Sequence, residues 1–226
     1  MDQTIFDPID VYCERLGPGL WAEPLNAVTN LAFIVAAVIC LRRLGHPAPP
    51  LGLTLVIILA AIGVGSGLFH TFANGLTALI DVLAIAAYIF VYVFAVNRHV
   101  LGWSRTSAWA SMLALVPYLV LATAGFAAVP GFEVSAAYWS VWALIAAYGV
   151  ILWSRRPAFA RGLLIGAAIL AVSITARSVD LGLCERIPFG THFLWHILNG
   201  IMLGWMIETY RRAMRATPLA APPSRG

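Results

Sequence analysis

Long apolar runs alternate with short polar stretches along almost the whole chain. Each run holds about 20 residues, the length that a helix needs to cross a bilayer, and prolines mark several of the stretches between them. The runs cover residues 22–43, 51–71, 76–97, 106–127, 134–154, 159–181 and 190–213. This pattern predicts an all-α integral membrane protein, with residues 22–213 forming a seven-transmembrane helix bundle as one domain.

Two polar stretches lie outside these runs. Residues 1–21 are acidic and interrupted by proline, without the basic start and apolar core of a signal peptide. We therefore expect an extramembrane amino-terminal segment. Residues 214–226 are polar and rich in proline, a composition that predicts a disordered cytoplasmic tail.

The composition agrees with a membrane protein and excludes two other classes. Of the 226 residues, 61% are hydrophobic and 11% are charged, against about 25% charged residues in a soluble domain. All 14 basic residues are arginine, so no lysine is available to bind retinal, and a microbial rhodopsin is excluded. The net charge of +4 is explained by the loops and requires no nucleic-acid partner.

The arginines are unevenly divided between the two sides of the predicted bundle. The loops after odd-numbered runs and the tail contain Arg42, Arg43, Arg98, Arg105, Arg155, Arg156, Arg161, Arg211, Arg212 and Arg215. The opposite side is mostly acidic, with Asp2, Asp7, Asp10, Glu14, Glu133 and Glu185. Because positive loops stay in the cytoplasm, we expect the amino terminus outside and the carboxyl terminus inside. Compact loops and abundant alanine and arginine favour a bacterial inner membrane, although an organelle membrane has the same topology.

Three histidines fall at the outer ends of these runs. His70 ends the second run, and His192 and His196 open the seventh with a spacing that puts them on one helix face. Asp81 opens the third run, and Ser66 lies one helical turn before His70. Ionisable side chains in a bilayer usually have a function, and three imidazoles with a water are the ligands of a catalytic zinc ion. The topology therefore predicts one metal site near the outer face.

Each of these residues also has a purely structural interpretation. His70 alone would often bond to a carbonyl at a helix end, and Asp81 would cap a helix. Ser66 would be a small packing residue. These interpretations stay open one by one, but together they require four polar residues to reach one membrane side by coincidence.

Other polar residues inside the runs predict further contacts. Glu23, Asn26 and Asn30 recur at helical spacing and should point into the bundle. We interpret the asparagines as hydrogen bonds between helices, whereas Glu23 would orient a ligand or bind a cation. Arg177 and Asp180 are interpreted as a structural ion pair. Close helix contacts are expected at four glycines: Gly63, Gly67, Gly200 and Gly204.

Two of the three cysteines lie on the predicted outer side, where disulfides persist. Cys13 is in the amino-terminal segment and Cys184 precedes the seventh run. We expect a disulfide that ties this segment over the site, with two free thiols as the alternative. Cys40, inside the first run, is expected to be a free packing thiol.

Three blocks of residues resemble the alkaline ceramidase family, part of a wider group of seven-span membrane metal hydrolases that includes the progestin and adiponectin receptors. They are Glu23-x-x-Asn26-x-x-Thr29-Asn30, Ser66-x-x-Phe69-His70 with Asp81, and His192-x-x-Trp195-His196. Asn30 resembles the ceramidase branch, because the receptor branch usually has histidine there. Tyr12-Cys13-Glu14 and Cys184 are similar to the family's amino-terminal motif and its disulfide partner.

The resemblance implies a zinc ion held by His70, His192 and His196, with Ser66 and Asp81 beside the attacking water. Zinc would activate the water and polarise an amide carbonyl. Asp81 would accept the proton of the water, and Ser66 would donate a hydrogen bond to the developing oxyanion. The substrate would be ceramide or a ceramide-like membrane lipid, cleaved to a fatty acid and a sphingoid-type amine.

The resemblance also implies a calcium site in the amino-terminal segment. Its candidates are Asp10, Tyr12, Glu14 and Glu23. The sequence departs from the family here, because Val11 stands where an aspartate is usual and Leu16 where an asparagine is usual. Asp10 is one residue out of register.

Three other functions stay open. The same metal would also serve a lipid esterase or phospholipase, or a receptor-like binding protein without turnover. A metal transporter is disfavoured, because the polar residues cluster at one end of the bundle. The oligomeric state is not determined by any of these patterns.

Overall fold

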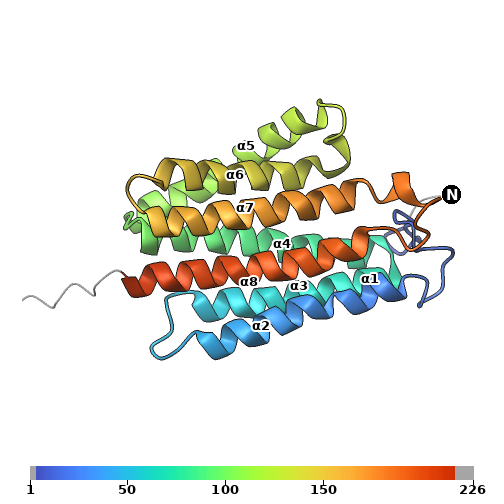
Figure 1. The fold of residues 1–226 in the computed structure, drawn as a ribbon, viewed down its shortest axis with the longest axis horizontal. Coiled ribbons are helices and arrows are strands. Elements are labelled where there is room, and N and C mark those ends of the chain that lie inside the picture. Colours follow the sequence, from blue (N-terminus) through green and yellow to red (C-terminus); the bar gives the residue numbers. More distant parts are fainter. Residues whose placement is uncertain (1–3, 217–226) are drawn as a thin grey trace, which may run out of the picture.

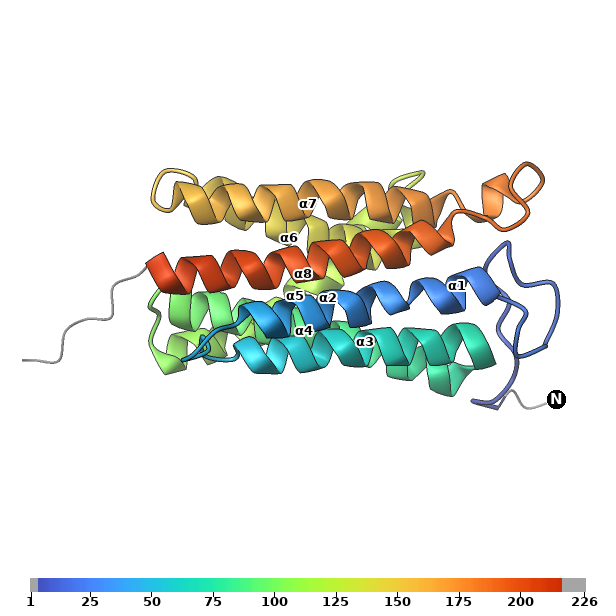
Figure 2. The same cartoon turned by 60° about the horizontal axis from the view of Figure 1, so that its bottom comes forward.

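The computed structural model describes residues 4–216 as a bundle of long helices that lie side by side (Figures 1 and 2). The helices are α1 (Pro24–Thr29), α2 (Leu31–Arg43), α3 (Gly52–Phe72), α4 (Gly75–Ala95), α5 (Arg105–Ala127), α6 (Ala136–Leu152), α7 (Pro157–Ser178) and α8 (His192–Ala216). Three short segments accompany them: the π-helix η1 (Val96–Val100) and the 3-10 helices η2 (Glu133–Ser135) and η3 (Leu181–Leu183). The described residues contain no β-strand, so the predicted all-helical architecture is confirmed.

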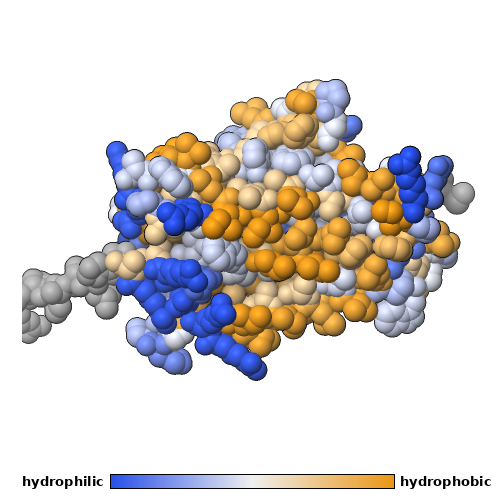
Figure 3. All heavy atoms as spheres, viewed as in Figure 1, coloured by the Kyte–Doolittle hydropathy of each residue, from blue (hydrophilic) through white to orange (hydrophobic). Residues whose placement is uncertain are grey.

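Six of the helical stretches are long and apolar enough to cross a membrane. They are Pro24–Arg43, Gly52–Phe72, Gly75–Val100, Arg105–Ala127, Glu133–Leu152 and Pro157–Ser178. On the face shown in Figure 3, apolar residues cover the middle of the bundle and hydrophilic residues gather at its two ends. This distribution matches a bilayer with water on both sides, and it supports a multi-pass membrane protein.

Helix α8 has a different character because it lies inside the bundle. It packs against α2, α7, α3 and α1, and Figure 2 shows it between α2 and α7. Its 25 residues are long enough to cross a bilayer. Five of its buried side chains are polar: His192, His196, Asn199, Glu208 and Thr209. Polar side chains that face protein rather than lipid lower the hydropathy of this helix while leaving its packing intact.

Glycines allow the central helices to approach closely. A Cβ atom built on Gly200 of α8 would lie 2.9 Å from the carbonyl carbon of Ala32 in α2. A Cβ on Gly63 of α3 would lie 2.9 Å from the Phe33 Cβ. At Gly204 the nearest atom, the Cβ of Ala36, would lie 3.3 Å away, whereas at Gly67 the nearest atom, the Cβ of Asn30, would lie 3.9 Å away in ordinary contact. The expected packing role is therefore strongest at Gly200 and Gly63.

The amino-terminal segment lies over one end of the bundle, which carries the histidines and is called the histidine end below (Figure 2). The backbone N–H of Ile9 donates to the Ala73 carbonyl, 2.7 Å away, in the turn between α3 and α4. The predicted disulfide between Cys13 and Cys184 is present and ties the segment to the loop before α8. Cys40 is a buried free thiol, as expected.

Two boundaries differ from those expected. The first apolar run is divided at Asn30, between α1 and α2. Helix α8 continues to Ala216, so residues 214–216, assigned to the disordered tail, are helical. The rest of that predicted tail, residues 217–226, lies outside the described residues.

Candidate metal centre

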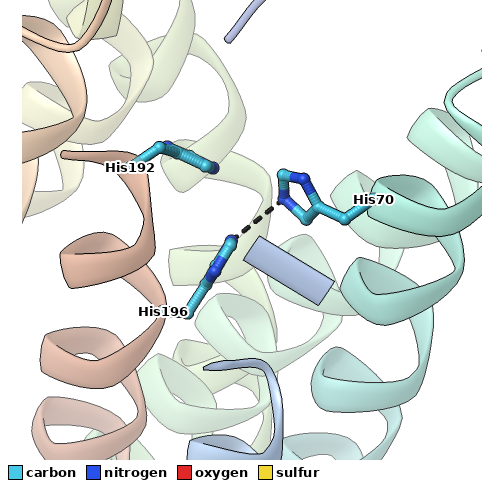
Figure 4. Close-up of side chains that lie close together, drawn as sticks. All are labelled: His70, His192 and His196. Carbon is cyan, nitrogen blue, oxygen red and sulfur yellow. Dashed lines mark hydrogen bonds between the residues drawn. The ribbon is translucent and has the colours of Figure 1, made fainter. Parts of the chain in front are cut away.

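The three histidines meet at the histidine end, as the sequence predicts. His70 comes from the last turns of α3, and His192 and His196 come from the first two turns of α8 (Figure 4). One nitrogen of each ring lies within 4.8 Å of one nitrogen of each of the others. All three residues are buried, with exposed fractions of 1%, 2% and 0%. Among the described residues, this is the one group of three or more potential ligands that lies close enough to share a metal ion.

Neighbouring residues hold the second nitrogen of two of these rings. The Nδ1 atom of His70 lies 2.5 Å from Glu23 Oε2, and the Nδ1 atom of His196 lies 3.0 Å from Thr29 Oγ1. A carboxylate only accepts hydrogen bonds, so it accepts from Nδ1–H of His70. The Thr29 hydroxyl donates its proton to the Leu25 carbonyl, 2.8 Å away, so its oxygen accepts from Nδ1–H of His196. In a neutral ring this hydrogen bond puts the proton on Nδ1 and leaves Nε2 unprotonated.

This arrangement fits a metal ion. The Nε2 atoms of His70 and His196 lie 3.0 Å apart (Figure 4), so two neutral rings that both carry their proton on Nδ1 would bring two lone pairs together here. A shared cation would relieve that repulsion, because neutral imidazole nitrogens are metal ligands whose second nitrogen is usually held by a carboxylate, carbonyl or hydroxyl. The Nδ1 atom of His192 is buried and has no hydrogen-bond partner among the described residues. With one nitrogen from each of the three rings, the cluster forms a donor set suited to a metal cofactor.

Asp180 fixes the start of α8 and therefore the position of His192. Its Oδ1 atom accepts from the backbone N–H groups of Thr191 and His192 at 2.6 and 2.8 Å. Its Oδ2 atom accepts from the backbone N–H of Cys13 at 2.9 Å. One buried carboxylate thus joins the amino-terminal segment to the first turn of the ligand helix. Asp180 and His192 are 12 positions apart in the chain, so the local sequence contains no signal for this contact.

The expected ion pair between Arg177 and Asp180 is wrong. Arg177 donates instead to the Val134 carbonyl and the Ser135 hydroxyl, at 3.0 and 2.8 Å. Its guanidinium also lies over the Trp195 ring, 5.8 Å from the centroid. Helix α7 ends at Ser178, between the two residues, and tertiary contacts give each side chain another partner.

Tyr12 covers the histidines from the amino-terminal segment. Its ring stacks on His192 with centroids 3.6 Å apart and planes 15° apart. Burial raises the pKa of the Tyr12 hydroxyl to about 12, so it stays protonated at neutral pH. The hydroxyl accepts a long hydrogen bond from Arg177 at 3.5 Å. The disulfide at the next residue, Cys13, helps to hold this cover in place.

Ser66 and Asp81 line a largely apolar cavity between the helices of the bundle. The Ser66 side chain interacts with the Asp81 carboxylate. Helices α3 and α4 approach closely here, since a Cβ on Gly65 would lie 3.4 Å from the Asp81 Cα atom. The Oδ1 atom of Asp81 is buried without a hydrogen-bond partner in the described structure. The other lining residues include Phe33, Ile62, Ile85, Val141, Leu170 and Leu203.

The remaining predicted residues form contacts of their own. Asn26 donates to Glu23 Oε2 at 3.2 Å, and Asn30 donates to the Asn26 carbonyl at 2.8 Å. Both bonds stay within one segment, so the hydrogen bonds expected between helices are not formed by these amides. Glu14 accepts from the backbone N–H groups of Leu25 and Asn26 at 2.6 and 2.8 Å, which caps α1.

The four calcium candidates do not form a common donor set. Asp10 is exposed, whereas both carboxylate oxygens of Glu14 are engaged by backbone N–H groups. Both carboxylate oxygens of Glu23 are bonded to Arg15 and His70. Tyr12 directs its ring onto His192. Calcium takes six to eight oxygen ligands, so these residues as they lie do not fit it.

Arg15 was not predicted as a site residue. Thr29 and Trp195 were included only as members of the motifs, without a role of their own. The role of Thr29 has a partial signal in the sequence. A threonine one helical turn after Leu25 donates its hydroxyl proton to the Leu25 carbonyl, and its oxygen can then accept a hydrogen bond from another residue. For Arg15 the sequence contains no comparable signal, because its contact with His70 spans 55 residues.

A family model described as Ceramidase matches residues 17–219, which is most of the chain. The matched region contains the three histidines, Ser66 and Asp81, and it begins after the Tyr12-Cys13-Glu14 motif. No curated protein matches the chain.

Proposed function

Because this chain belongs to the ceramidase family, we propose that it is a zinc-dependent amidohydrolase that cleaves ceramide or a ceramide-like lipid within a membrane. The observation that carries the proposal is the buried cluster of three imidazoles, in which the Nδ1 atoms of His70 and His196 are bonded to Glu23 and Thr29, so that Nε2 is the nitrogen left for a metal. The products would be a fatty acid and a sphingoid-type amine. The family supports the choice of an amide bond, and the donor set supports zinc.

The histidines would hold the metal, Asp81 would transfer protons, and Ser66 would donate a hydrogen bond. Zinc, when bound by His70, His192 and His196, supplies Lewis-acid polarisation of the amide carbonyl and activation of water. Asp81 would take a proton from the attacking water and return it to the leaving amine nitrogen, so that one water is consumed per amide bond. Ser66 would donate a hydrogen bond to the oxygen that becomes negative in the transition state.

The cavity beside Ser66 and Asp81 supports a lipid substrate. Its lining is mostly aliphatic and aromatic, and it passes between helices that are apolar on their outer surface. An acyl chain in this cavity would place a polar headgroup toward the histidine end, where Tyr12 and the amino-terminal segment cover the site. Apolar burial of the chain would position the amide beside the metal.

We further propose that α8 crosses the membrane as a seventh span. With seven spans the termini lie on opposite sides, and the arginine-rich loops assign the amino terminus and the histidine end to the outer side. In a bacterial inner membrane the site would face the periplasm. An oxidising outer side agrees with the disulfide between Cys13 and Cys184.

The test combines metal analysis with lipid hydrolysis on the purified protein. Replacing one ligand, His196→Ala, should abolish both bound zinc and release of fatty acid from ceramide. The matched control is His46→Ala, because His46 is an exposed histidine in the loop before α3. Full hydrolysis by a protein without bound metal would refute the mechanism. If the protein cleaved a matched ester lipid but not the amide, its activity would be that of an esterase and not of an amidase.

A further inference from the structure

A buried arginine, Arg15, lies next to the histidine cluster and contacts the backbone of His70. The Arg15 side chain is 3% exposed, and its Nε atom lies 2.5 Å from Glu23 Oε1. Its Nη1 atom donates to the Gly17 carbonyl and its Nη2 atom donates to the His70 carbonyl, both at 3.1 Å. The three guanidinium nitrogens therefore bond to three different parts of the chain.

Arg15 and the metal candidate His70 are linked through one carboxylate. Glu23 bonds to Arg15 through Oε1 and to His70 Nδ1 through Oε2, 2.5 Å away, while Asn26 Nδ2 also donates to Oε2. A carboxylate held on one side by a bidentate or charged donor keeps its orientation on the other. Glu23 is 1% exposed, so no solvent is available to replace a missing partner. An unpaired charge in this position would be strongly unfavourable.

This cation occupies the region in which the family resemblance implies calcium. Val11 and Leu16 have no side-chain oxygen to offer, and Glu14 is engaged by the first turn of α1. A calcium ion would also compete with a permanently charged guanidinium for Glu23, and the two cations would repel each other. The departures at Val11 and Leu16 and the buried Arg15 agree with one explanation, namely that a cationic side chain stands where calcium would bind.

We propose that the Arg15 guanidinium is a built-in cation that replaces calcium and positions His70 through Glu23. The guanidinium of Arg15 then fixes the amino-terminal segment to the end of α3 through the His70 carbonyl. Because this charge belongs to the protein itself, the protein needs no calcium. Arg15 is a positioning residue, since it contacts His70 only at the backbone carbonyl and does not line the substrate cavity. Its effects on hydrolysis and on zinc retention rest on the function proposed above, but its effect on the calcium response does not.

The first experiment uses the full-length, zinc-loaded protein in lipid nanodiscs. Its thermal unfolding midpoint and its hydrolysis of ceramide should be the same in calcium chloride and in a calcium-selective chelator. A saturable rise of the unfolding midpoint with calcium would overturn the proposal. This measurement needs no variant, and the thermal midpoint is informative even if the substrate is not ceramide.

The second experiment compares variants at temperatures below their own unfolding midpoints. Arg15→Gln should weaken zinc retention against a competing chelator by roughly 10- to 100-fold, the range found when partners of metal ligands are removed. Its kcat should fall while KM changes little, and Arg15→Lys should recover part of the zinc retention, because it restores the charge without the fork of donors. The control is Arg186→Gln at an exposed arginine of the same end. Equal zinc retention by Arg15→Gln and Arg186→Gln would overturn the positioning role.

Discussion

Single hydrogen bonds outside the histidine cluster determine which ring nitrogens are free to bind a metal. The Thr29 oxygen, 3.0 Å from His196 Nδ1, accepts a hydrogen bond because the Thr29 proton is already donated to the Leu25 carbonyl. Glu23 has the corresponding role at His70. A hydroxyl and a carboxylate thus select the same tautomer at two rings, and this selection is what prepares the cluster for a metal.

The role of Thr29 can be tested by a nearly isosteric change. Thr29→Val removes the acceptor of His196 Nδ1–H but keeps the branched side chain, so zinc retention should fall by roughly 10- to 100-fold. Competition with a chelator, followed by metal analysis, measures this loss. Thr175→Val is the matched control, because Thr175 also bonds to the carbonyl four residues earlier but lies exposed on α7. Unchanged zinc retention in Thr29→Val would show that the tautomer is set in another way.

At the scale of helices, close contacts through glycine bring α2 and α8 together. Gly200 allows α8 to lie directly on Ala32, and His196 lies one helical turn before Gly200 on the same helix. The distance between the two backbones is therefore part of the geometry that places His196 beside Thr29. Small residues are the usual means of such close approach in membrane bundles.

Adding one methyl group should separate these helices. In Gly200→Ala the new Cβ atom would meet the backbone of Ala32 at 2.9 Å, so we expect a loss of about 1–3 kcal/mol in stability. Gly125→Ala in α5 is the control, because no atom lies within 4 Å of its Cβ position. Thermal unfolding in the same detergent compares the two variants. Equal midpoints for both would mean that α8 does not depend on this contact.

The helices were predictable from the sequence, but the partners of their polar residues were not. Apolar length is a local property, and it predicted the long helices; together with the charges of the loops it also predicted which residues gather at the histidine end, including the bonded Cys13 and Cys184. The partners of Asp180 and Arg177 depend on elements distant in the chain: Cys13 for the first residue and Val134 for the second. The i, i+3 spacing of the two residues indicated an ion pair between them, but in the folded protein each side chain bonds to a different segment.

At the scale of the whole molecule, charge and polarity divide the bundle into two different ends. The histidine end has the disulfide, the metal candidates and the amino-terminal segment, and hydrophilic residues also gather at the opposite end in Figure 3. The arginine-rich loops belong to that opposite end. An odd number of spans is needed to keep the two termini apart, and α8 supplies the seventh only if its buried polar residues are tolerated inside the protein.

Labelling of single introduced cysteines tests this topology. In a Cys40→Ser background, a membrane-impermeant maleimide should label Thr4→Cys in intact spheroplasts, whereas Ala48→Cys and Ala216→Cys should react only after permeabilisation. All three positions are exposed, and the bonded cysteines at 13 and 184 do not react without a reductant. Ala48, between α2 and α3, serves as the internal reference for the inner side, because it follows a span that does not depend on α8. Labelling of Ala216→Cys in intact spheroplasts would mean that α8 does not cross, and the reverse pattern at all three positions would invert the orientation while keeping seven spans.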